Sequence, residues 1–407
     1  MTRFSAALLA AGIAGSVLPL AAAAPAVALT SPYAAEVVPC DENTVPETEV
    51  LKDSPSKVSG PLERMHVPQA HEVTDGQGVS VVVIDSGIQT GLGINQGPST
   101  GLSDVAGPLL SGHGTIVAGL IAGPHGVAPG AEVIDVRIFH KDDPDVAEGE
   151  TGVTSDRIAQ GIETAIRLHD TVKFKVVNIS LSVTEDDQRL REAIKELQRR
   201  DVVVVASSSN APEEQDESFK GTPDNDAEVY PADYRGVVAV SAAPPAEGSP
   251  IGSVLPNLDI DVAAPTVGGV SINANGVTCD IDELATSWAA AEVTGVVALL
   301  RAAYPRESAK QAVARLVATA EGSHTVRNPW TGAGVVQAHD ALTRSLSPGR
   351  SGRIERPLLQ NRGEATAPLP PKRLDLFGSS RALLLWCGLG GGALMALAFM
   401  VRPLIRR

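Results

Sequence analysis

The chain has 407 residues, of which 43% are hydrophobic and 20% charged, so it is long enough to bury a large core. Length alone allows two or three domains. The formal net charge of -15, without an obvious basic patch, argues against nucleic acid as a partner, and we interpret the acidity as favouring solubility.

The first 28 residues have the pattern of a secretory signal peptide. Arg3 precedes an apolar run rich in Ala and Leu, which ends in Ala26-Val27-Ala28. This ending fits a small-x-small cleavage site. We predict removal at or near Ala28, with an uncleaved anchor as the alternative.

Residues 29–70 are predicted to be an N-terminal extension that wraps the domain after it. Prolines and scattered charges interrupt this stretch, and no sustained hydrophobic period appears. It holds too few apolar residues to build the small core that a cleavable inhibitory segment needs. We therefore predict an extended arm.

Strand and helix patterns alternate from residue 71 to residue 345. Apolar, β-branched runs predict buried strands, and apolar residues at helical spacing predict helices between them. Such alternation predicts one α/β domain with a mostly parallel sheet flanked by helices on both faces. The predicted strands are 79–84, 131–139, 176–181, 202–205 and 237–241, and the predicted helices are 115–122, 155–168, 185–200 and 287–304.

The C-terminal part is predicted to be a linker and a membrane span. Residues 346–381 are rich in Pro and Arg, which is typical of a linker. Residues 382–401 carry no charge and are long enough to cross a bilayer. Residues 402–407 include three arginines, as expected of a cytoplasmic tail. Basic residues also flank the other end, so the orientation rests on the signal peptide, which makes this span a stop-transfer segment.

Three cysteines add a further constraint. Cys387 lies in the predicted span, whereas Cys40 and Cys279 lie in the exported part, where disulfides persist. We predict a bridge from Cys40 to Cys279, with two separate free thiols as the alternative.

Three short segments hold the residues of a nucleophilic site. Asp85 lies at the C-terminal end of the predicted strand 79–84, His113 lies between two glycines in Ser111–Thr115, and Ser287 opens a predicted helix. A serine hydroxyl becomes a good nucleophile when a histidine takes its proton and a buried carboxylate orients that histidine. The free N–H groups at the start of a helix also favour developing negative charge.

Two further features concern charge. Asn210 follows the apolar run 202–205, where its side-chain amide can donate to an oxyanion beside the N–H of Ser287. The acidic residues Asp142, Asp143 and Asp145 are interpreted as a solvated loop rather than a calcium site. We predict no metal and no cofactor.

These segments resemble the subtilisin-like serine proteases, in which acid, base and nucleophile follow in the order Asp, His, Ser. The resemblance covers the chain from Val67 to Leu346. It implies the fold of that family, hydrolysis of peptide bonds, and roles as acid, base and nucleophile for Asp85, His113 and Ser287. It also implies that Ser180-Leu181-Ser182 pairs with an extended protein or peptide substrate.

Four positions depart from the usual pattern of that family. Ala285 and Ser209 replace glycines before the nucleophile and the oxyanion residue, Ala291 replaces a proline, and Ser182 replaces another glycine. If position 285 requires a positive φ, the Cβ of Ala285 strains the nucleophile's turn by about 1 kcal/mol or more. We therefore expect the segment around Ser287 to be the place where activity fails first.

The combination of segments resembles the mycosins, the membrane-anchored proteases of actinobacterial type VII secretion. That resemblance implies a single-pass membrane protein with an extracytoplasmic catalytic domain, associated with the bilayer and with type VII secretion membrane components. The leading hypothesis is an active serine endopeptidase. The alternatives are a weakly active scaffold that stabilises a secretion complex, suggested by Ala285, Ala291 and Ser209, and a surface-anchored degradative protease.

Overall fold

The computed structural model describes residues 38–48, 59–141, 147–211, 226–244, 253–322, 328–354 and 378–405. The chain divides into two compact units, Met1–Ile354 and Glu355–Arg407. The predicted signal peptide, most of the predicted linker, the last two residues of the predicted tail and Asp142, Asp143 and Asp145 lie outside the described residues.

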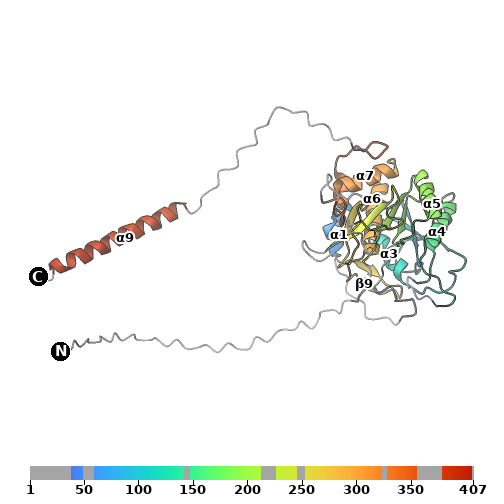
Figure 1. The fold of residues 1–407 in the computed structure, drawn as a ribbon, viewed down its shortest axis with the longest axis horizontal. Coiled ribbons are helices and arrows are strands. Elements are labelled where there is room, and N and C mark those ends of the chain that lie inside the picture. The colour runs from blue at the N-terminus through green and yellow to red at the C-terminus, as the bar shows by residue number, and fades with distance from the viewer. Residues whose placement is uncertain are drawn as a thin grey trace, which may run out of the picture. The chain divides into compact units, whose positions relative to one another are not determined.

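A seven-stranded sheet forms the centre of the first unit (Figure 1). Its strands follow the order β2-β3-β1-β4-β5-β6-β7, and every neighbouring pair is parallel. The predicted α/β fold with a mostly parallel sheet is confirmed. The strands are β1 (Ser80–Asp85), β2 (Gln96–Gly101), β3 (Glu132–Arg137), β4 (Val176–Ile179), β5 (Val203–Ser207), β6 (Val238–Ala243) and β7 (Val262–Pro265).

Helices cover both faces of this sheet because alternate side chains of each strand point to opposite faces. In β1, Val82 and Ile84 join the core under α4 (Ser155–Leu168) and α5 (Gln188–Arg199). Val81 and Val83 join the opposite core, which includes α3 (His113–Ala122) and α6 (Thr286–Ala303). With both faces covered, the strands consist largely of apolar residues.

Helix α6 is buried on all sides over most of its length. It contacts β4, β5, β6 and β7 as well as α3, which makes it the central helix of its layer. A helix that is apolar all round is expected in such a position. Its burial fixes the first turn, which carries Ser287, against the carboxyl end of the sheet.

The N-terminal extension is not extended throughout, and the prediction of an arm is wrong for residues 60–70. This part forms α1 (Gly60–Arg64) and α2 (Val67–Ala70). Pro61 and Pro68 lie in the first turns of these helices, where a missing N–H costs nothing. Met65 is fully buried in the core, so the globular domain begins before residue 71.

Several elements were not predicted from the sequence. An antiparallel hairpin of β8 (Val270–Ile272) and β9 (Thr278–Asp280) packs against α3. The edge strand β2 contains glycine and proline instead of an apolar run, which is typical of edge positions. Helices α7 (Ala309–Thr319) and α8 (Ala338–Thr343) complete the layer around α6.

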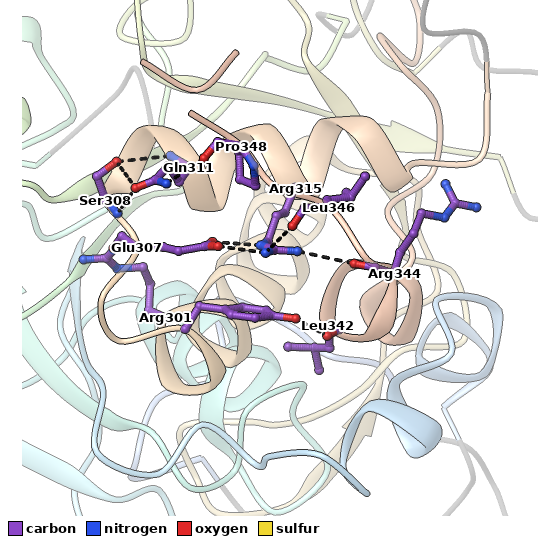
Figure 2. A network of polar contacts seen from close by, with 10 residues as sticks. Arg301, Glu307, Ser308, Gln311, Arg315, Leu342, Arg344, Leu346 and Pro348 are labelled. Atoms are coloured by element: carbon purple, nitrogen blue, oxygen red, sulfur yellow. Dashed lines mark hydrogen bonds and ion pairs between the residues drawn. The ribbon is translucent and has the colours of Figure 1, made fainter. Parts of the chain in front are cut away.

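A polar network around Arg315 holds the end of the globular domain (Figure 2). The buried guanidinium of Arg315 donates to both carboxylate oxygens of Glu307, at 2.8 and 2.7 Å, and to the carbonyl of Leu346 at 2.9 Å. Gln311 donates to the carbonyl of Pro348 at 2.7 Å. Residues 346–348 are thus fixed to α7, although the sequence predicted a linker from 346.

The second unit contains one long helix, α9 (Gly378–Ile405). The segment Leu383–Met400 is long and apolar enough to cross a membrane, and its side chains are exposed in this structure. It coincides with the predicted span.

Candidate active site

Asp85 is the last residue of β1 and is fully buried. Its carboxylate accepts a hydrogen bond from the backbone N–H of Ser86 at 2.7 Å. Gly87 follows with a φ of 102°, and a Cβ there would lie 2.7 Å from the side chain of Leu109. A glycine is therefore needed for the chain to turn away directly after the carboxylate.

His113 is the first residue of α3 rather than part of a flexible loop. Its Nδ1 lies 2.8 and 3.0 Å from the two carboxylate oxygens of Asp85. Gly114 permits this approach, because a Cβ there would lie 2.6 Å from the carbonyl oxygen of Gly87. The two residues come from different elements, and both are buried.

Ser287 lies in the first turn of α6 and is largely buried. The ring of the adjacent Trp288 lies 4.8 Å from the imidazole of His113, centroid to centroid. Ser180 donates from its hydroxyl to the backbone carbonyl of Ser287 at 2.8 Å. The structure therefore brings the turn of the predicted nucleophile beside the Asp85–His113 pair.

Asn210 contacts the same helix start. Its side-chain oxygen accepts from the backbone N–H of Thr286 at 2.8 Å and from the hydroxyl of Thr286 at 3.1 Å. The hydroxyl of Thr286 also bonds to that of Ser207 at 2.6 Å. Since these bonds use the amide oxygen, the side-chain N–H groups of Asn210 take no part in them.

The expected strain lies at Ser209 and not at Ala285. Ala285 has φ −133° and ψ 139°, an extended conformation that any residue adopts. Ser209 instead has a φ of 77°, in the left-handed region that favours glycine. The premise behind the predicted strain at Ala285 is wrong, because the turn before Thr286 does not require a positive φ.

The predicted substrate segment follows the end of β4. Ser180 and Leu181 are buried and Ser182 is partly exposed. The hydroxyl of Ser180 is committed to Ser287 and to the side chain of Asn178. A role for this segment in substrate pairing therefore involves its backbone, and it stays a prediction.

The disulfide between Cys40 and Cys279 is confirmed, with its sulfur atoms 2.08 Å apart. It fixes the arm to β9, where the N–H of Cys40 also donates to the carbonyl of Asp280 at 2.9 Å. Two residues further on, the carbonyl of Glu42 accepts from the N–H of Gly112 at 2.6 Å. No pattern in the sequence indicated that the arm reaches Gly112, the residue before His113.

Two buried carboxyl groups, Asp135 and Glu292, and the partly buried Asp233 have raised pKa values because burial disfavours their charged forms. The pKa of Asp135 rises to about 6, as does that of Asp233. The pKa of Glu292, which is fully buried in α6, lies well above its usual range. Within the described ranges, no group of three or more His, Cys, Asp or Glu side chains could hold a metal ion.

The comparisons with known proteins agree with this fold. The model of the subtilase family matches residues 76–334. Mycosin-1 of Mycobacterium tuberculosis (strain ATCC 25618 / H37Rv) is 28% identical, over 94% of this chain and 97% of its own length. A solved structure of the MycP3 protease from the type VII (ESX-3) secretion system is 28% identical with a TM-score of 0.59, covering 75% of this chain and 92% of that one. An intact ESX-5 inner membrane complex contains a chain of the same fold, 23% identical with a TM-score of 0.59, covering 89% of this chain and 94% of that one.

The chain belongs to the subtilase family, whose members are serine proteases. Within that family it is related to the mycosins of type VII secretion, as the resemblance of its segments implied.

Proposed function

We propose that the chain is a serine endopeptidase whose catalytic residues are Asp85, His113 and Ser287. The observation that carries this proposal is the buried pairing of His113 Nδ1 with Asp85 at 2.8 Å, beside the helix start that holds Ser287. Asp85 fixes the proton on Nδ1, which leaves Nε2 as the basic nitrogen. Nε2 takes the proton of Ser287 as the hydroxyl attacks the peptide carbonyl, and returns it to the leaving amine.

Asn210 is proposed to donate to the oxyanion formed in this step, together with the backbone N–H of Ser287. The bonds from Thr286 hold the amide oxygen of Asn210, so the amide is orientated before substrate binds. Donors fixed in advance stabilise the transition state without reorganising. The substrate is proposed to be an extended polypeptide that pairs with the backbone of Ser180-Leu181-Ser182.

Hydrolysis of an unfolded polypeptide by the purified full chain tests this assignment. Ser287→Ala is expected to lower kcat by roughly a thousandfold or more. Ser208→Ala is the matched control, because Ser208 is a buried serine whose hydroxyl has no hydrogen-bond partner among the described residues. Equal activity in wild type and Ser287→Ala would refute the assignment.

The apolar helix α9 and the similarity to the mycosins support a proposal about the membrane. We propose that α9 crosses the bilayer once, with the catalytic domain on the extracytoplasmic face and the C-terminus in the cytoplasm. The signal peptide and the linker expected from the sequence belong to this proposal, with a catalytic domain that begins before residue 71 and continues beyond residue 345. Resistance of the full chain to alkaline extraction, with release of a chain ending at Ile354, is the expected result; a reporter fused after Arg407 tests the orientation.

The proposed partners are membrane components of type VII secretion, since a chain of this fold occurs in the ESX-5 inner membrane complex. The second candidate function is a scaffold with little turnover, which the left-handed Ser209 beside Asn210 favours. The two functions differ in one comparison. If secretion survives Ser287→Ala and fails on deletion of the chain, the scaffold function is required for secretion; if both abolish it, proteolysis is required.

A further inference from the structure

A second carboxylate lies on the strand beside the catalytic acid. Asp135 is in β3, where it pairs with Val83, two residues before Asp85 in β1. Side chains of paired residues on parallel strands share a face, so Asp135 and Asp85 lie on the same side of the sheet. Arg137, two residues after Asp135, pairs with Asp85.

The burial of Asp135 lowers the stability of the fold, because its carboxylate is only partly hydrogen-bonded. It is 5% exposed, its Oδ2 accepts from the hydroxyl of Ser99 at 2.8 Å, and its Oδ1 is buried without a hydrogen-bond partner among the described residues. Burial of an incompletely bonded carboxylate costs stability, and such residues gather at functional sites. Packing alone therefore does not explain why a carboxylate occupies position 135.

Arg137 does not form an ion pair with this carboxylate. Its two terminal nitrogens donate instead to the carbonyls of Gly107 and Pro108, each at 2.9 Å. The charged groups near Asp135 are Asp85 from β1 and Arg137 from its own strand, while β2 brings the hydroxyl of Ser99. Arg137 offsets the negative charge of Asp135 only in part, and Asp85 in turn bonds to Nδ1 of His113.

The turn that follows Asp85 lies next to Asp135. Ile88 of this turn lines the same pocket as Asp135, and the N–H of Ser86 bonds to Asp85 at 2.7 Å. The same turn carries the carbonyl of Gly87, against which Gly114 of α3 packs. Two carboxylates on adjacent strands therefore organise the three residues between β1 and the contact with α3.

We propose that Asp135 is a positioning residue for the triad: it holds the turn after Asp85, and its charge supports the imidazolium of His113. This inference rests on the proposed roles of Asp85 and His113. When Asp135 is neutralised, the imidazolium loses a nearby anion, so His113 releases its proton at a lower pH. For charges on adjacent strands this shift is roughly half a pH unit or more.

The experiment measures the second-order rate at which a fluorophosphonate probe labels the purified full chain, from pH 5 to pH 9. Asp135→Asn is expected to move the midpoint of the rise in labelling rate to lower pH by roughly half a unit or more. Glu292→Gln is the matched control. Glu292 is also a buried carboxyl group, but it lies in α6 and not on a strand beside Asp85, so the midpoint should stay in place. Asp135→Ser replaces Asp135→Asn if the latter does not fold.

The same shift can be read without catalysis, as the midpoint of the titration of His113 in a chain labelled with ¹³C-histidine. The signal is assigned by its loss in His113→Ala. Absence of probe labelling in the folded wild type overturns the proposed triad, whereas an unchanged His113 midpoint in Asp135→Asn overturns this inference. A change in thermal stability alone, with both midpoints unchanged, also overturns it.

Discussion

Replacement of two residues by glycine separates the strained position from the unstrained one. Ser209 has a φ of 77°, where a side chain costs about 1–2 kcal/mol, and the backbone entropy of glycine takes back about 0.5–1 kcal/mol of this. Ser209→Gly should therefore stabilise the fold by about 0.5–1 kcal/mol. The bonds lost are weak: the hydroxyl of Ser209 donates to the carbonyl of Asn210 at 3.4 Å. Ala285 has an extended φ of −133° and is the N-cap of α6, where the preference for glycine over alanine offsets the backbone entropy of glycine. Ala285→Gly should therefore change the stability by less than about 0.5 kcal/mol.

Thermal unfolding of the two variants beside the wild type measures this difference. In a domain of this size, 1 kcal/mol corresponds to about 2–4 °C, so the midpoint should rise more in Ser209→Gly than in Ala285→Gly. The rate of probe labelling is expected to respond only at position 209, which precedes the residue that contacts Thr286. A larger rise in Ala285→Gly than in Ser209→Gly, or destabilisation by Ser209→Gly, would show that the strain was assigned to the wrong position.

Three other substitutions test separate parts of the fold. Burial raises the pKa of Asp135 from 3.8 to about 6, so the native state keeps a proton that the unfolded state releases. This carboxyl group therefore destabilises the fold increasingly as the pH rises from about 4 to 6. Asp135→Asn should therefore gain up to about 3 kcal/mol at pH 7 relative to pH 4, and a gain independent of pH would contradict the shift. Gly112→Ala places a Cβ 2.6 Å from the carbonyl oxygen of Thr44 and should displace the arm. Reduction of the disulfide between Cys40 and Cys279 also releases the arm, so the losses of thermal stability from the two changes should not add. Full additivity of the two losses would contradict the contact. Arg315→Met leaves Glu307 without its bidentate partner and should cost about 3 kcal/mol in thermal unfolding, which a loss below about 0.5 kcal/mol would refute.

The central elements could be predicted because burial on both faces makes their sequences apolar. The helix predicted at 155–168 has the observed bounds of α4, and β1 lies within one residue of its prediction. The edge strand β2 escaped prediction because an exposed strand needs no apolar run. Helices α1 and α2 escaped because their prolines were interpreted as breaks, whereas the structure places them in first turns.

The candidate site was predictable only where one local segment holds the information. The order of Asp85, His113 and Ser287 and the small residues around them indicated a serine protease. The contact of Trp288 with His113, the bond from Ser180 to Ser287 and the reach of the arm to Gly112 join distant segments. Such contacts depend on the assembled sheet. A charged residue inside the apolar run of β3 was the one available sign that Asp135 has a role.

The assignment of Ser287 as nucleophile is the central claim. Its most direct test is mass-spectrometric mapping of the fluorophosphonate adduct on the purified full chain. We expect a single adduct on Ser287, with labelling lost in Ser287→Ala and strongly reduced in His113→Ala. A folded chain that carries no adduct, or carries it on another residue, would contradict the account.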